Sequence, residues 1–114
     1  MIAVDTNVLV RHLYQQDDPA QTRIANQVMA DAFAAGDPIF VSVIVLVETV
    51  WVLRREYAID RRGLLRVLDA LSEQAHIVLE HADLVRSSIN PARRGRADFA
   101  DRLLGEIAHA AGAR

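Results

Sequence analysis

The sequence predicts a layered α/β domain built on a mostly parallel sheet. Three short apolar segments with strand character, at 1–4, 39–41 and 76–79, alternate along the chain with longer segments of helical periodicity. Strands separated by helical segments are typical of a parallel sheet flanked by helices. A chain of 114 residues is long enough to bury roughly two thirds of its unfolded surface, so we expect residues 1–114 to form one domain.

Composition and charge limit the classes of protein to which this chain can belong. Hydrophobic residues make up 52% of the chain and charged residues 25%, as in soluble globular proteins. The absence of cysteine excludes disulfides and thiolate metal sites, which is compatible with the cytoplasm. We expect no signal peptide and no membrane association. Because the net charge is −2, any attraction for nucleic acid must be local, through metal ions or arginine clusters.

The first strand, 1–4, runs directly into Asp5, Thr6 and Asn7, and a short helix is predicted from Thr6 to about Tyr14. Ligands of parallel α/β sheets bind beyond the carboxyl ends of the strands, which is where Asp5 would stand. Asp5 is therefore a candidate metal ligand. Asp5 or Thr6 is equally suited to cap the following helix, and this stretch alone favours the cap.

The next helix has a clear start signal. Two acids and a proline at 17–19 predict a helix that runs to about Ala35, where Gly36-Asp37-Pro38 ends it. We expect its buried stripe to consist of Ile24, Val28, Ala32 and Ala35. The second strand, 39–41, follows.

Ser42 is the predicted cap of a helix that extends to about Tyr57. Its first residues are β-branched, but the apolar pattern is too long for one strand, so we expect tertiary context to override local propensity. Glu48 is the only charged residue between Pro38 and Arg54. A carboxylate buried there would require a cation, a hydrogen-bond donor or a metal. The alternative is a glutamate that faces water or pairs with a nearby arginine.

Asp60 is predicted to cap a helix to about Gln74 whose buried stripe is leucine-rich: Leu64, Leu65, Leu68 and Leu71. After the third strand we expect a helix from His81 to about Asn90, closed by Pro91, and then a basic loop over 92–96. Arg93, Arg94 and Arg96 of that loop could contact RNA phosphates, although most such runs are simply solvated.

Asp98 and Asp101 lie one helical turn apart at the start of a last helix, which should run to about Ala111 with Gly112 beyond its end. An N-cap aspartate followed by an acid at the third helical position explains both residues without any chemistry. Together with Asp5 and Glu48, however, they form a set of carboxylates of the kind that binds Mg²⁺ or Mn²⁺. Spacing alone does not show that these acids meet in space.

Three segments together resemble a known family. They are Val4-Asp5-Thr6-Asn7-Val8-Leu9, the segment 45–53 around Glu48, and Ala97-Asp98-Phe99-Ala100-Asp101. Each is weak alone, but their order and spacing over essentially the whole chain resemble the PIN-domain ribonucleases of the VapC toxin type.

The resemblance implies a PIN-like three-layer fold and a metal-dependent endoribonuclease, the toxin of a type II toxin–antitoxin system. It implies that Asp5, Glu48 and Asp101 hold Mg²⁺ or Mn²⁺, and that Asp98 joins them or positions a metal-bound water. Thr6 and Asn7 would orient Asp5 by hydrogen bonds. The implied partners are RNA, a VapB-like antitoxin that covers the site, and a second copy of the toxin.

The chain departs from the family pattern at its end. The pattern continues into another strand, often Thr-Phe-Asp, with a fourth acid, whereas this sequence stops at Arg114. We therefore expect the strand before Asp5 to have an unpaired edge. A fragment, a shortened and impaired copy, and a site completed by a partner all stay open. The alternative function is accordingly a PIN fold that binds antitoxin or RNA without cutting it, and a third possibility is a structural domain whose acids are all caps.

Overall fold

The fold is organised around a small parallel sheet. A computed structural model describes residues 1–14, 19–94 and 98–113, with 19, 21, 91, 93 and 94 described by their backbone alone. Within these residues the strands are β1 (Ile2–Ala3), β2 (Ile39–Val41) and β3 (Ile77–Leu79), in the order β1-β2-β3. All pair in parallel, with Ile2 opposite Ile39 and Ile39 opposite Ile77. The predicted α/β class and all three strands are confirmed, and β1 is an edge of the described sheet.

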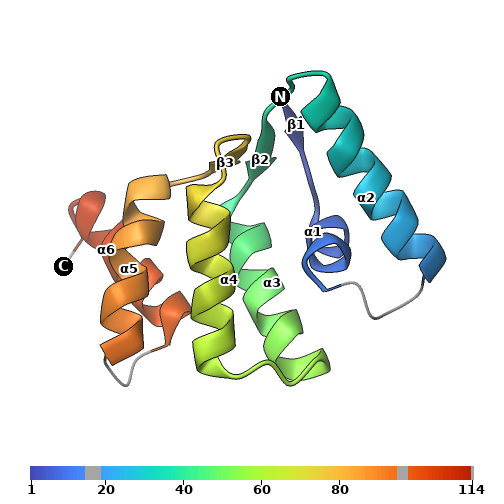
Figure 1. Ribbon diagram of the computed structural model, residues 1–114. Helices are drawn as coiled ribbons and strands as arrows, with labels where there is room; N and C mark the ends of the chain where they lie inside the picture. Colours follow the sequence, from blue (N-terminus) through green and yellow to red (C-terminus); the bar gives the residue numbers. More distant parts are fainter. Residues whose placement is uncertain (15–18, 95–97, 114) are drawn as a thin grey trace.

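The described chain contains six helices. They are α1 (Thr6–Leu13), α2 (Pro19–Ala34), α3 (Val43–Glu56), α4 (Arg61–Glu73), α5 (Ala82–Arg94) and α6 (Phe99–Ala110). Neighbours pack in the succession α2, α1, α3, α4, α5 and α6, so that α3 lies in the middle of the row (Figure 1). None of these helices combines the length and the apolar character needed to cross a membrane.

The core lies between the sheet and the central helices. The buried face of the sheet carries Ile39, Val41, Ile77 and Leu79, whereas Val78 on the opposite face of β3 is exposed. Leucines of several helices complete the same cluster: Leu9, Leu46, Leu65, Leu68, Leu71 and Leu103. The leucine stripe predicted for α4 is confirmed in full. This packing fixes the ends of the strands relative to α1 and α3.

Of the buried stripe predicted for α2, only Ala32 is buried. Ile24 is 65% exposed, Val28 is 37% exposed and Ala35 is exposed, whereas Thr22, Ala25 and Met29 are buried with Ala32. The predicted and the observed faces share Ala32, and Ile24 and Val28 each lie one position before a buried residue, so periodicity alone does not choose between the two faces. Ala25 lies beside residues of α1, and its small side chain allows the two helices to pack together, which favours the second face.

The predicted end of α5 is also wrong. The helix does not stop before Pro91 but continues to Arg94, so that part of the predicted basic loop is helical. Ala92 is fully buried, and the guanidinium of Arg61 donates to its carbonyl oxygen. These tertiary contacts beyond Pro91 offset the cost of a proline inside a helix.

Candidate functional site

Asp5 lies at the carboxyl end of β1, where it begins α1. Its backbone is extended, and its Oδ1 accepts a hydrogen bond of 2.9 Å from the backbone N–H of Val8. Asp5 is therefore an N-cap, as the simpler interpretation predicted. The side chain is exposed, and the cap engages only one of its two carboxylate oxygens. The cap and a ligand role are thus compatible in one side chain.

Glu48 is brought to the same place by α3. Ser42 begins that helix by accepting a hydrogen bond of 3.1 Å from the N–H of Val45, as predicted. Glu48 follows one and a half turns later on the exposed side, so its carboxylate does not pay the burial cost that the apolar sequence suggested. The Thr6 hydroxyl donates to Oε2 of Glu48 at 3.0 Å. Residues 42 positions apart in the sequence therefore meet beside Asp5.

This contact changes the role predicted for Thr6. Its hydroxyl has one proton, and that proton is given to Glu48 rather than to Asp5. Thr6 thus positions the second acid of the set, not the first. Asn7 is exposed at the mouth of a groove between α1 and α2, lined also by Val8, Arg11 and Ile24, and its support of Asp5 stays a prediction.

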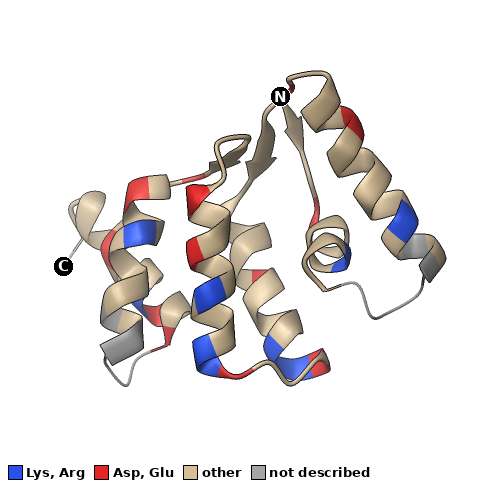
Figure 2. Ribbon diagram, in the orientation of Figure 1, with Lys and Arg blue, Asp and Glu red and all other residues tan. Residues whose placement is uncertain are grey.

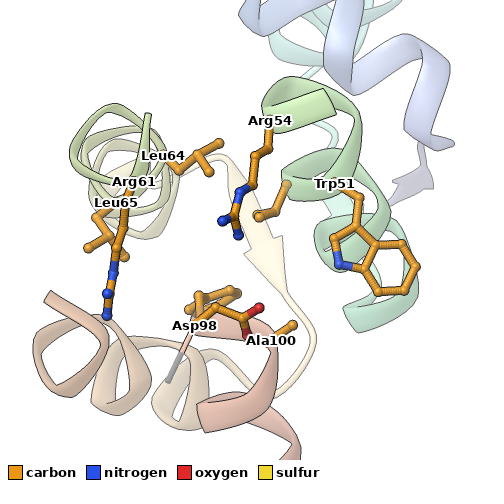
Figure 3. Close-up of a pocket in the computed structure, with 9 residues that line it drawn as sticks. Trp51, Arg54, Arg61, Leu64, Leu65, Asp98 and Ala100 are labelled. Carbon is orange, nitrogen blue, oxygen red and sulfur yellow. The ribbon is translucent and has the colours of Figure 1, made fainter. Parts of the chain in front are cut away.

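Asp98 and Asp101 begin α6. Oδ1 of Asp98 accepts a hydrogen bond of 2.9 Å from the N–H of Asp101, which is the predicted capping pair. Asp98 also lines a cavity of about 90 Å³ together with Trp51 and Arg54 of α3 (Figure 3). Asp98 therefore faces the helix that carries Glu48. The Asp101 side chain is exposed on the first turn of α6.

Glu80 is an acid of this region that the sequence analysis did not select. It directly follows β3, and its Oε1 accepts a hydrogen bond of 2.8 Å from the N–H of Val43, the first residue of α3. Its backbone N–H continues the sheet by donating to the carbonyl of Val41. The signal that could have found it is the one that singled out Asp5: a carboxylate directly after a predicted parallel strand.

Sequence comparison assigns the fold to a family. The profile of the PIN domain matches residues 2–114. The chain belongs to the PIN domain family. Among solved structures, the PIN domain described here resembles VapC20 of Mycobacterium tuberculosis, a toxin that cleaves the sarcin–ricin loop. The two share 22% identity with a TM-score of 0.51 over 99% of this chain and 85% of VapC20. No curated protein matches the chain.

The side-chain oxygen atoms at this site are of the chemical type that binds a hard divalent cation. Asp5, Glu48 and the Thr6 hydroxyl supply only oxygen donors, the kind that Mg²⁺ and Mn²⁺ prefer. Among the described residues, however, no three acids or histidines lie close enough to form a ready-made metal cluster. The structure thus joins Glu48 to Thr6, the residue after Asp5, and metal binding by Asp5, Glu48, Asp98 and Asp101 stays a prediction.

The predicted phosphate contacts lie outside the described residues. This holds for Arg96 and for the side chains of Arg93 and Arg94.

Proposed function

We propose that this PIN domain is a metal-dependent endoribonuclease that acts as the toxin of a type II toxin–antitoxin pair. The observation that carries the proposal is the hydrogen bond between Thr6 and Glu48, which joins the first and second acidic segments beside Asp5. Caps alone do not require these two segments to meet. The third possibility, a structural domain whose acids lie apart, does not account for this contact.

The residues that would hold Mg²⁺ or Mn²⁺ are Asp5 and Glu48, with Asp101 as a proposed third ligand and Asp98 beside it. The cation would supply charge neutralisation on the scissile phosphate and a lowered pKa for the attacking water. The chain's own contribution is orientation. The Val8 N–H fixes Asp5 through Oδ1, and the Thr6 hydroxyl fixes Glu48 through Oε2, so each carboxylate retains one oxygen for a ligand.

The partners follow from the same proposal. RNA is the substrate, a VapB-like antitoxin covers the acids, and the toxin acts as a homodimer in the cytoplasm. VapC20 cleaves the sarcin–ricin loop, and that RNA is therefore one substrate to include in an assay.

A cleavage assay tests the enzyme directly. End-labelled RNA is incubated with Mg²⁺, with Mn²⁺ or with EDTA, using the wild-type protein, Asp5→Asn and Glu48→Gln. We expect cleavage by the wild type only, and only with a divalent cation. Equal cleavage by all three proteins would remove the proposal.

The second candidate is a PIN fold that binds RNA or antitoxin without cutting. It is favoured by the lack of a three-acid cluster in the described part of the chain. It predicts saturable RNA binding in EDTA and no cleavage with either metal. Cleavage that Asp5→Asn abolishes would decide against it.

A further inference from the structure

The only tryptophan of the chain lies on the surface next to the candidate site. Trp51 is 54% exposed and follows Glu48 by three residues on α3, so the two side chains share a face of that helix. Along the helix axis, Trp51 is about 4.5 Å beyond Glu48. Its ring projects on the side of α3 that faces away from α4 (Figure 3). The core gives no reason for a large aromatic side chain at this position.

Positive charge gathers at the adjoining ends of α3 and α4. Arg54 and Arg55 end α3, and three further arginines occupy the first half of α4: Arg61, Arg62 and Arg66. Figure 2 shows this charge at the adjoining ends of the two helices. Trp51, Arg54 and Arg55 line one shallow hollow, and the α4 arginines line another with Leu65. A chain of net charge −2 thus has an arginine cluster at 54–66, of the local kind that its composition would require for nucleic-acid binding.

The charges of Arg54 and Arg55 are available to a ligand. Both side chains are exposed, and in the described part of the chain neither has an ion-pair or hydrogen-bond partner. The guanidinium of Arg54 extends from α3 into the space in front of Asp98 (Figure 3). The acids nearest in sequence, Glu56 and Asp60, are also exposed, and Asp60 is engaged in capping α4. Asp98 lines the same cavity as Arg54, and its Oδ1 is engaged in capping α6.

We propose that Trp51, Arg54 and Arg55 form a binding face for single-stranded RNA, with a base stacked on the indole and phosphates held by the two guanidiniums. The inference rests on the proposed function, because it names the part of α3 that receives the strand next to Glu48. Arg55 lies about 10 Å beyond Glu48 along the helix. The face therefore spans one to two nucleotides beside the acids.

Charge favours RNA over a protein as the occupant. Tryptophan and arginine are also enriched in protein interfaces, so the observation that points to a polyanion is the pair of guanidiniums with no acidic partner among the described residues. Here the aromatic ring of Trp51 shares one hollow with two arginines of α3, Arg54 and Arg55. Sequence-independent binding of single strands combines a positively charged track with aromatic stacking platforms, which is the combination that this face presents.

The sole tryptophan provides the measurement. The full chain is titrated in EDTA with oligouridylate and oligoadenylate, and Trp51 fluorescence is recorded. We expect saturable quenching by both oligonucleotides. For variants that lack the tryptophan, the affinity for RNA is measured by the fluorescence anisotropy of labelled oligouridylate. Trp51→Ala should weaken binding by about 5- to 150-fold, and Trp51→Phe should retain much of it.

Salt dependence tests the arginines. Each phosphate contact on a single strand contributes about 0.7 to the slope of log K against log salt. Arg54→Gln and Arg55→Gln should each reduce that slope by about 0.7. Phe33→Ala and Arg23→Gln are the matched controls, because both residues are exposed on α2, away from this face. Both controls should bind as the wild type does.

The outcomes separate this inference from the proposed function. RNA binding at Trp51 without cleavage in Mg²⁺ supports the RNA-binding face and contradicts the proposed ribonuclease activity. If Trp51→Ala cleaves RNA with the KM of the wild type, and RNA does not quench Trp51 fluorescence, the RNA-binding face is contradicted and the proposed ribonuclease activity stands. A shift of Trp51 emission on raising the protein concentration without RNA, with no response to RNA, shows a surface between two copies and also overturns it.

Discussion

Substitution of Asp5 separates the two roles that its carboxylate combines. In the structure Oδ1 caps α1 through Val8 N, while the rest of the group is open to a ligand. Asparagine caps helices about as well as aspartate because its amide oxygen accepts the same hydrogen bond. Asp5→Asn therefore keeps the cap and removes the negative charge, whereas Asp5→Ala removes both.

The expected stability changes are measurable. Loss of an N-cap costs about 1 kcal/mol. For a chain of 114 residues the entropy of unfolding is about 0.24 kcal/mol/K, so Asp5→Ala should lower Tm by about 4 °C. Asp5→Asn should stay closer to the wild type than Asp5→Ala, because it keeps the cap and loses only the charge–dipole attraction, which is worth about 0.3–1 kcal/mol on an exposed side chain.

Addition of Mg²⁺ then distinguishes the ligand role. At ten times its Kd, a bound ion stabilises the folded state by about 1.4 kcal/mol, or about 6 °C here. Thermal unfolding by circular dichroism, in EDTA and in Mg²⁺, should show this rise for the wild type and not for Asp5→Asn. If Asp5→Asn gains the same stabilisation and cleaves RNA as well as the wild type, Asp5 is a cap only and the reasoning fails.

Three further substitutions test the site and the core. Thr6→Val should reduce RNA cleavage with little change in stability, since the bond to Glu48 is exposed, and Thr6→Ser should restore the rate in the same cleavage assay. Thr49→Val should raise the free energy of unfolding in urea by about 1–3 kcal/mol, because the buried Thr49 hydroxyl has no hydrogen-bond partner among the described residues; a loss of stability would contradict this. Leu68→Ala should lower the same free energy by about 2–5 kcal/mol. Leu104→Ala, at a side chain that is 68% exposed, is its control, and similar losses at both positions would refute the assigned core.

The starts of the helices were predictable because their signals are local. Ser42 determines α3 in this way: it caps a segment of β-branched residues, and the burial of Leu46, Thr49 and Leu53 at helical spacing then stabilises the helix. The failures occurred where tertiary packing decides. Two faces of α2 have almost the same periodicity, and contacts around Ala92 carry α5 past a proline.

The site was predictable as a list of acids but not as an arrangement. The sequence identified Asp5 and Glu48 by their neighbours along the chain. It could not assign the Thr6 hydroxyl to Glu48, because that contact depends on how α1 and α3 lie side by side. Glu80 had the same local signal as Asp5, a carboxylate directly after a strand, and only its contact with Val43 depends on β2 and β3 being adjacent in the sheet.

Three of the acids in this region share a structural feature that explains how they can coexist. Asp5, Glu80 and Asp98 each accept a backbone N–H from the first turn of a helix: α1, α3 and α6 respectively. The partial positive charge at a helix N-terminus stabilises a carboxylate there, which reduces the cost of gathering negative charges. Because Asp5 and Asp98 are caps as well as candidate active-site groups, substitutions that remove the acceptor oxygen damage fold and function together. Only substitutions that keep that oxygen, such as aspartate to asparagine, can measure the chemistry of this site separately from its folding.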